Sequence, residues 1–265
     1  MAPSDETAPA LDALVGGVRA VLDDGVLGAY LVGSFALGGA DEWSDVDVVA
    51  AVEAPPDGQS LEALASIHAH LPDAGGWAAR LEVSYAVAAD LRSPMSLGRR
   101  WWHVADGSRE LALSADANTA HTRWVLRERG VTLAGPDPAV LVAEVAPDVL
   151  RAEALGIARA QAEELEDHLD RLASAWWQPH VVMTACRVLH TAVHADVVGG
   201  AAAARSALAV LDPRHRAVVE RAVAARPHPH RRRHEPADPG LAVPTRALVW
   251  DVVRLAGEAA LTART

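Results

Sequence analysis

The sequence predicts an α+β protein in two parts, a mixed sheet with helices over residues 1–147 and an all-α helical bundle over residues 148–265. In the first part, segments with strand spacing alternate with segments of helical spacing, whereas only helical spacing recurs after Pro147. The chain has 265 residues, 51% of them hydrophobic. A chain of this size can bury one large core or two modest ones, which agrees with two domains.

Three strands are expected in the first part. Residues 26–32 form a continuous apolar run, and residues 45–52 alternate carboxylate and apolar side chains before two prolines stop the pattern. Ser60 is expected to cap the helix that follows. Residues 80–88 predict a third strand with its apolar side chains on one face and Glu82 on the other. Strands interrupted by helices predict a layered sheet domain.

Amphipathic helices are expected in the second part. Residues 149–172 carry leucine and alanine at intervals of three or four residues, which predicts one helix. Residues 181–198 predict another, ended by Gly199 and Gly200. Thr245 is expected to cap the final helix. The second part is therefore predicted to be a helical bundle.

A stretch rich in proline and arginine, residues 226–240, separates the last two helices. Prolines disfavour regular structure, so an exposed loop is predicted. A metal site at His228, His230 and His234 is the alternative, but the neighbouring arginines repel cations and no cysteine or carboxylate set completes such a site. Arginines of this loop are candidates for contacts to phosphate.

The composition excludes several classes of function. The formal net charge of −11 disfavours nonspecific binding to nucleic acid. The chain contains no lysine, which excludes a lysine Schiff base and a P-loop lysine. The single cysteine, Cys186, excludes an internal disulfide and is expected in the core. No long apolar run or signal-peptide start is present, so we expect a cytoplasmic protein without membrane attachment. We also expect a monomer.

The segment 31–49 contains the residues that point to chemistry. Gly33 allows a tight turn whose backbone can approach a phosphate, and Ser34 offers a hydroxyl and an amide to anionic oxygens. Asp45 and Asp47 lie two positions apart on a predicted strand, so both carboxylates leave the same face with Cα atoms roughly 7 Å apart. Such a pair suits Mg²⁺, which binds through a few carboxylates together with substrate phosphates.

Glu82 is the candidate general base, because it is a lone carboxylate on an otherwise apolar strand. Completing the metal shell is its second possible role, and a solvated strand residue is the alternative for Glu82 alone. Gly-Ser and Asp-x-Asp are each common in ordinary turns and strand ends. Their combination at this spacing favours a site for a magnesium nucleotide.

These motifs resemble the signature of the DNA polymerase β-like nucleotidyltransferase superfamily, in which Gly-Ser precedes Asp-x-Asp by ten or so residues. Ten residues separate Ser34 from Asp45 here. Within the superfamily the closest resemblance, along nearly the whole chain, is to the streptomycin/spectinomycin adenylyltransferases. It implies that Gly33 and Ser34 bind the nucleotide, that Asp45 and Asp47 bind Mg²⁺ and take part in catalysis, and that Glu82 is the catalytic base.

The resemblance implies Mg²⁺-dependent transfer of AMP from ATP to a hydroxyl of a small polyhydroxylated acceptor, such as an aminoglycoside or aminocyclitol antibiotic. Residues 148–265 would then bind the acceptor, and the expected partners are the acceptor and the nucleotide. The family places a basic side chain of the helical domain near the phosphates; Arg187 or the arginine loop would take its place here. In those enzymes, acidic residues just before a bundle helix bind the drug. The corresponding residues of this chain, 176–180, include no carboxylate. Two alternatives therefore stay open: transfer to a protein or RNA, and a nucleotide-binding or drug-binding regulator without turnover.

Two aromatic clusters, Trp101–Trp102–His103 and Trp176–Trp177, allow two interpretations. Clustered tryptophans most often pack between domains, and the alternative is an aromatic wall for adenine or the acceptor.

Overall fold

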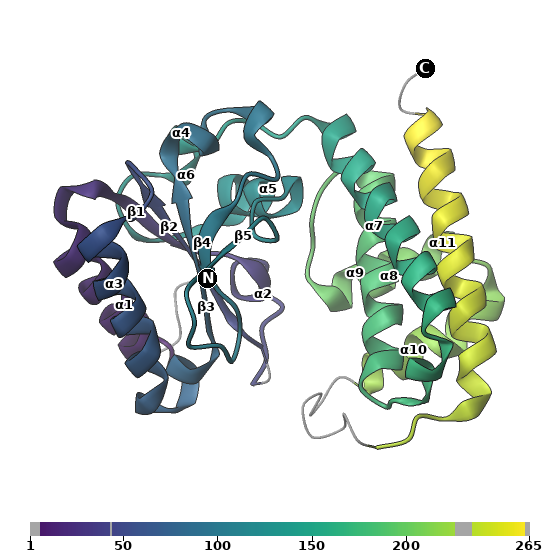
Figure 1. The fold of residues 1–265 in the computed structure, drawn as a ribbon. Coiled ribbons are helices and arrows are strands. Elements are labelled where there is room, and N and C mark those ends of the chain that lie inside the picture. Colours follow the sequence, from purple (N-terminus) through teal and green to yellow (C-terminus); the bar gives the residue numbers. More distant parts are fainter. Residues whose placement is uncertain (1–5, 43, 226–234, 263–265) are drawn as a thin grey trace. The chain divides into compact units, whose positions relative to one another are not determined.

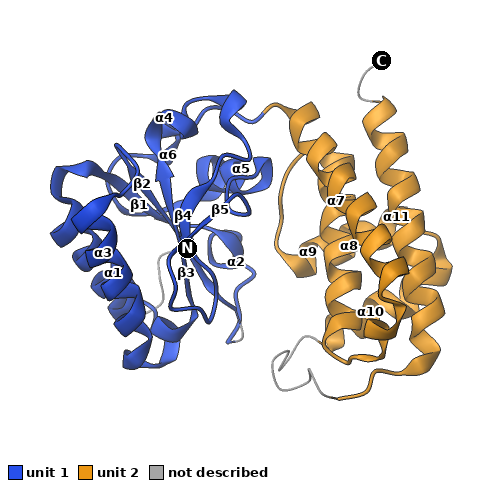
Figure 2. Cartoon of the chain, in the orientation of Figure 1, with its two compact units in different colours: residues 1–145 blue, residues 146–265 orange. Residues whose placement is uncertain are grey.

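The computed structural model describes residues 6–42, 44–225 and 235–262. The chain divides into two compact units, residues 1–145 and 146–265 (Figures 1 and 2). The first unit contains a mixed sheet with helices, and the second is helical. The predicted α+β class, with its helical C-terminal part, is thus confirmed.

The first unit is built on a six-stranded sheet in the order β5-β4-β3-β2-β1-β6. The strands are β1 (Val26–Leu31), β2 (Val46–Val52), β3 (Leu81–Val87), β4 (Trp101–Val104), β5 (Ala112–Ser114) and β6 (Val131–Ala134). Strands β2 and β3 are parallel, and the other neighbours are antiparallel. The sequence predicted the first three strands and missed the last three, which are too short to show an alternating pattern.

Two helices cover one face of this sheet (Figure 1). The helices of the unit are α1 (Ala8–Leu22), α2 (Gly33–Ala36), α3 (Gly58–His70), α4 (Ala88–Leu91), α5 (Ala120–Arg129) and α6 (Pro138–Leu141). Leucines of α1 and α3 pack on the apolar side chains of β2 and β3. The predicted cap of α3 is wrong, since α3 begins after Asp57 and Ser60 lies inside it, accepting a hydrogen bond from the Asp57 N–H at 3.1 Å.

A buried arginine organises the end of the first unit. Arg123, 2% exposed, donates hydrogen bonds to the Asp90 carbonyl at 2.9 Å and to the side chain of Asn118 at 2.8 Å. Its guanidinium lies 5.6 Å from the ring centre of Trp101, whose indole N–H donates to the Asp90 carboxylate. Trp101 is therefore a core residue of the first unit.

The second unit is a bundle in which α8 contacts the other four helices (Figure 1). Its helices are α7 (Pro147–Asp167), α8 (Trp177–His194), α9 (Gly200–Val210), α10 (Arg216–Ala224) and α11 (Ala242–Thr262). Cys186 is fully buried in the core of this bundle, as predicted, and burial raises the pKa of its thiol to about 12. The thiol is therefore a packing group rather than a nucleophile.

The ends of the bundle helices differ from the predicted ones. The predicted helix 149–172 ends at Asp167, and a separate 3-10 turn, η5 (Leu169–Ala173), follows. Leu172 is buried in spite of this break, which explains why the apolar spacing continues past the helix end. Thr245 does not cap the last helix, because α11 begins at Ala242 and encloses Thr245 in the core.

Helix α8 also ends earlier than predicted. It stops at His194, where Ala195 adopts a positive φ of 54° and supplies the left-handed residue that commonly ends a helix. Gly199 and Gly200 belong instead to the start of α9. The glycine pair therefore marks a helix beginning, not the helix end that the sequence suggested.

Part of the predicted arginine loop, residues 226–234 with its three histidines, lies outside the described residues, so the predictions for it stay predictions. Among the helices that the structure describes, none has the length and apolar character needed to cross a membrane.

Candidate active site

The turn between β1 and β2 is shaped around a carboxylate. The Val32 N–H donates to the Asp47 carbonyl at 2.9 Å, which brings the turn against β2. Gly33 has a φ of +58°, and a Cβ atom at this position would lie 1.8 Å from Oδ2 of Asp47. No other residue fits here without moving the carboxylate. The Gly33–Ser34 turn and Asp47 are thus in direct contact.

Three carboxylates meet beside this turn. Asp45, Asp47 and Glu82 each offer one oxygen atom, and the three atoms lie within 4.8 Å of one another. Asp47 lies on β2, and Asp45 immediately precedes the strand, which begins one residue later than the sequence predicted. The parallel register of β2 and β3 pairs Asp47 with Glu82. We call these three residues the acidic cluster; it is the one group of three potential metal ligands among the described residues.

The acidic cluster is electrostatically strained. Burial, followed by the charges of Glu82, Asp45 and Asp106, raises the pKa of Asp47 to about 7. Burial also raises the pKa of Glu82, partly opposed by the Asp106 N–H, which lies 3.4 Å from Oε2 of Glu82. Like charges held this close disfavour ionisation, and a bound cation would relieve the repulsion. The all-oxygen donor set fits a hard divalent ion such as Mg²⁺.

Ser34 brings an unsatisfied hydroxyl to the same turn. It is the second residue of the short helix α2, and its Oγ is buried without a hydrogen-bond partner in the part of the chain that the structure describes. An unpaired buried hydroxyl costs about 1–3 kcal/mol, so a ligand oxygen that paired with it would be favoured. This is consistent with the predicted contact between Ser34 and a nucleotide phosphate.

Two buried polar residues lie near Glu82, and the sequence analysis did not connect either of them with it. Ser84 on β3 and His103 on β4 are 4% and 9% exposed, and Ser84 Oγ lies 3.0 Å from Nδ1 of His103. Nε2 of His103 lies 3.8 Å from Oε1 of Glu82. Burial lowers the pKa of His103, so the ring is neutral near pH 7. The available signal was Ser84, which shares a strand face with Glu82, but β4 itself was not recognised.

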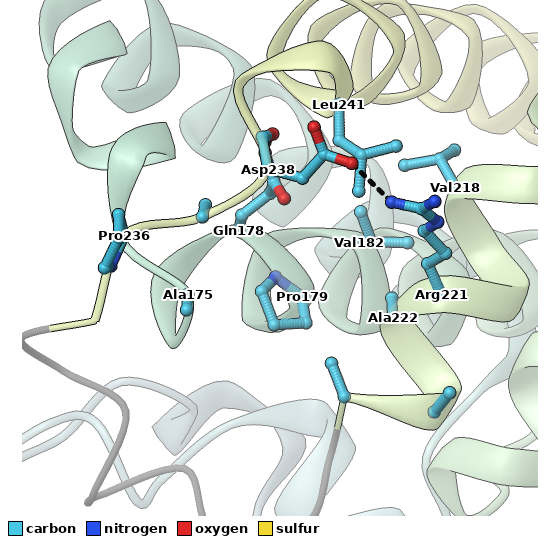
Figure 3. Close-up of a pocket in the computed structure, with 13 residues that line it drawn as sticks. Ala175, Gln178, Pro179, Val182, Val218, Arg221, Ala222, Pro236, Asp238 and Leu241 are labelled. Carbon is cyan, nitrogen blue, oxygen red and sulfur yellow. Dashed lines mark hydrogen bonds and ion pairs between the residues drawn. The ribbon is translucent and has the colours of Figure 1, made fainter.

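The second unit has a cavity of its own, of about 300 Å³ (Figure 3). Its wall is formed by Pro179 and Val182 of α8, Val218 of α10 and Leu241. The polar groups at this cavity are already paired: Arg221 forms an ion pair with Asp238, and the Gln178 side chain donates to backbone carbonyls. No member of the acidic cluster lines it.

The start of α8 carries the aromatic residues that the sequence singled out. The rings of Trp176 and His180 stack, with centres 5.2 Å apart and planes at 15°. Gln178 between them is buried, and no carboxylate lies in residues 176–180. Arg187, further along α8, donates to Thr184 Oγ1 at 3.3 Å. Contacts from this helix to an acceptor or a phosphate stay predictions.

Comparison with known proteins agrees with this geometry. Residues 17–97, which include the Gly33–Ser34 turn and the acidic cluster, match the family model of the nucleotidyltransferase domain. The fold is similar to the crystal structure of spectinomycin adenyltransferase AAD(9) from Enterococcus faecialis with ATP and spectinomycin. The TM-score is 0.68 at 14% identity over 94% of this chain and 99% of that chain. No curated protein matches the sequence. The resemblance in domain and fold is thus confirmed.

Proposed function

We propose that this chain, which is an enzyme of the nucleotidyltransferase type by virtue of its domain at residues 17–97, transfers AMP from ATP to a hydroxyl of a small acceptor. The acceptor class is a polyhydroxylated aminocyclitol or aminoglycoside, and pyrophosphate is the second product. The observation that carries the proposal is the convergence of the acidic cluster on the Gly33–Ser34 turn.

Asp45 and Asp47 are the residues that would hold Mg²⁺, since their oxygens lie together at the edge of the turn. When bound, the ion neutralises the triphosphate and polarises its phosphorus, which is what metal ions supply in phosphoryl chemistry. The raised pKa of Asp47 supports this role, because a carboxylate destabilised by its neighbours gains most from a cation.

The chain's own groups divide the remaining work. The Gly33 backbone allows close approach of the triphosphate, and the Ser34 hydroxyl donates to one of its oxygens. Glu82 takes the proton from the acceptor hydroxyl as that oxygen attacks the α-phosphorus and the bond to the pyrophosphate oxygen breaks. The raised pKa of Glu82 suits this task, because it makes the carboxylate a stronger base at neutral pH.

The acceptor class is the finer part of the proposal. Its support is the similarity of fold to an enzyme whose structure contains ATP and spectinomycin. We assign nucleotide binding to a domain at residues 1–147 and acceptor binding to a helical domain at residues 148–265. The lack of carboxylates at residues 176–180 argues against binding of the acceptor by acidic side chains at the start of α8.

A transfer assay tests the proposal. The purified chain is given Mg²⁺, labelled ATP and one aminocyclitol at a time, with spectinomycin and streptomycin first, and pyrophosphate and the mass of the acceptor are measured. We expect pyrophosphate release that depends on the acceptor and a gain of one AMP by the acceptor. Label transferred only to protein or RNA from a cell extract, or nucleotide binding without pyrophosphate, would overturn the proposed acceptor class or the proposed activity, respectively.

A further inference from the structure

Glu82 is flanked on one side by Asp47 and on the other by a buried polar pair. Strand β4 runs antiparallel to β3 with Ser84 paired to His103. Because side chains alternate along a strand, Ser84 points to the same face as Glu82, and His103 lies beside it on the neighbouring strand. Both members of this pair are nearly inaccessible to solvent.

The two oxygens of the Glu82 carboxylate face different partners. Oε2 faces the Asp106 N–H at 3.4 Å, and Oε1 faces Nε2 of His103 at 3.8 Å. The imidazole is held from behind by its 3.0 Å contact with Ser84. A carboxylate with a fixed group near each oxygen has fewer orientations open to it than one with a single partner.

We propose that His103 is a positioning residue that orients Glu82, with Ser84 fixing the tautomer and direction of its ring. The inference rests on the proposed function, because it concerns the residue assigned as the base. The ring has a second partner in the Val83 backbone. We assign the Ser84 hydroxyl hydrogen to Nδ1, so that the ring proton is on Nε2, the nitrogen nearest Oε1 of Glu82.

The 3.8 Å separation is longer than a hydrogen bond. Contacts of this kind often tighten only when the substrates are bound. We expect Oε1 of Glu82 to approach Nε2 of His103 in the substrate-bound enzyme. The neutral ring then donates to the base without taking its charge, so Glu82 stays able to accept the acceptor's proton.

Steady-state kinetics of three variants test the role. His103→Phe keeps a ring of similar volume and removes the N–H. We expect kcat to fall about tenfold to a hundredfold, the usual effect of losing a residue that orients a functional group, and KM for ATP to stay unchanged. His103→Gln keeps a donor and should recover most of the loss. In a Glu82→Gln background, His103→Phe should cause no further loss, because its effect passes through Glu82.

His68→Phe is the matched control. His68 is also a buried histidine, and its Nε2 contacts the Tyr85 hydroxyl at 2.7 Å on the opposite face of the same sheet. We expect it to lower the melting temperature without lowering kcat. If His68→Phe and His103→Phe reduce kcat equally, or if the His103 effect persists in full without Glu82, His103 has only a structural role and the inference is wrong.

A measurement that needs no turnover separates this inference from the proposed function. Nitrogen-15 NMR of the labelled full chain reports which ring nitrogen of His103 carries the proton. We expect the proton on Nε2, and a change of the Nε2 signal in Glu82→Gln. A proton on Nδ1 would overturn the positioning role even in an active enzyme. If the expected tautomer is found in a chain without transferase activity, only the proposed function fails.

Discussion

The acidic cluster of the first unit and the ion-paired Asp251 of the second unit differ in how their carboxylates are balanced. In the first unit, none of the three carboxylates of the acidic cluster forms an ion pair with an arginine among the described residues, and the pKa of Asp47 is raised to about 7. In the second unit, Asp251 contacts His215 at 2.7 Å and pairs with Arg214. Partial burial would raise the pKa of Asp251, but these hydrogen bonds lower it.

The difference separates carboxylates that hold the fold together from carboxylates that are kept for a ligand. An ion-paired carboxylate stabilises the folded chain at neutral pH, whereas a cluster of unpaired ones destabilises it until a cation arrives. A strained acidic cluster in an otherwise well-paired protein is therefore an indication of function. Each prediction below either breaks this contrast or makes it quantitative.

The largest effect is expected for Asp47→Asn. Transfer should fall about a thousandfold or more, because the charge stabilisation that a metal supplies is worth several kcal/mol. In a chelator, however, the variant should melt at a higher temperature than the wild type, since the substitution removes a strained charge. Pyrophosphate release and thermal unfolding measure the two effects. A lower melting temperature would show that Asp47 stabilises the empty protein.

Glu82→Gln should reduce kcat about a hundredfold or more, the usual contribution of a general base. ATP should still bind in the presence of Mg²⁺, because Asp45 and Asp47 remain. Calorimetry of ATP binding, with and without Mg²⁺, and single-turnover transfer measure binding and chemistry separately. Transfer at the wild-type rate would show that Glu82 is not the general base.

Gly33→Ala should destabilise the first unit by about 2–3 kcal/mol, because the added Cβ meets Oδ2 of Asp47 and the backbone has a positive φ. Gly38→Ala is the matched control: Gly38 also has a positive φ, of 68°, but no atom lies within 4 Å of the added Cβ. The control should cost only about 1 kcal/mol. Denaturant unfolding measures both, and equal costs would mean that the contact with Asp47 is unimportant.

Asp251→Asn should lower the free energy of unfolding by about 1–2 kcal/mol, because it weakens the hydrogen bond between residue 251 and His215, which is 1% exposed. The sign is opposite to that expected for Asp47→Asn in a chelator. Thermal unfolding of the two variants side by side tests the contrast between the units directly. A shift in the same direction for both variants would contradict it.

The same contrast predicts a pH trend in the stability of the metal-free protein. The pKa of Asp47 is about 7 in the folded state against a reference value of 3.8, so the folded state holds the proton more tightly than the unfolded state. The contribution of Asp47 to stability is therefore present below pH 4 and is lost as the pH rises through about 7. At about 1.4 kcal/mol per pKa unit, this shift corresponds to a loss of about 4 kcal/mol. Urea unfolding across this range should show the trend in the wild type and a flatter one in Asp47→Asn.

Local patterns in the sequence predicted the residues of the site better than its geometry. Asp45 and Asp47 were placed on one face by the period of a strand, and Gly33 was identified by the turn that only glycine permits. Glu82 was proposed as a lone carboxylate on an apolar strand. Its position beside Asp47 depends on the parallel pairing of β2 and β3, which joins segments about 35 residues apart and has no signature in either segment.

The predicted element ends failed where tertiary packing overrides local spacing. The sequence predicted a helix as far as residue 172 because Leu172 continues the apolar spacing. Leu172 is indeed buried, but the helix ends at Asp167. Thr245 was predicted to cap the last helix because threonine favours that position. It lies instead inside α11 and is fully buried. Burial is a property of the assembled bundle, so the spacing of apolar residues does not show where a helix ends.

The sequence by itself determined the fold class, the order of a sheet-containing part and a helical part, and the identities of the five residues proposed for the site. These depend on interactions between neighbours in the chain, such as strand alternation, helical periodicity and the conformational freedom of glycine. Only the tertiary structure decided that three carboxylates share one small volume and that His103 lies behind Glu82. Those facts follow from the pairing of distant strands, which depends on the free energy of the whole sheet rather than on any one segment.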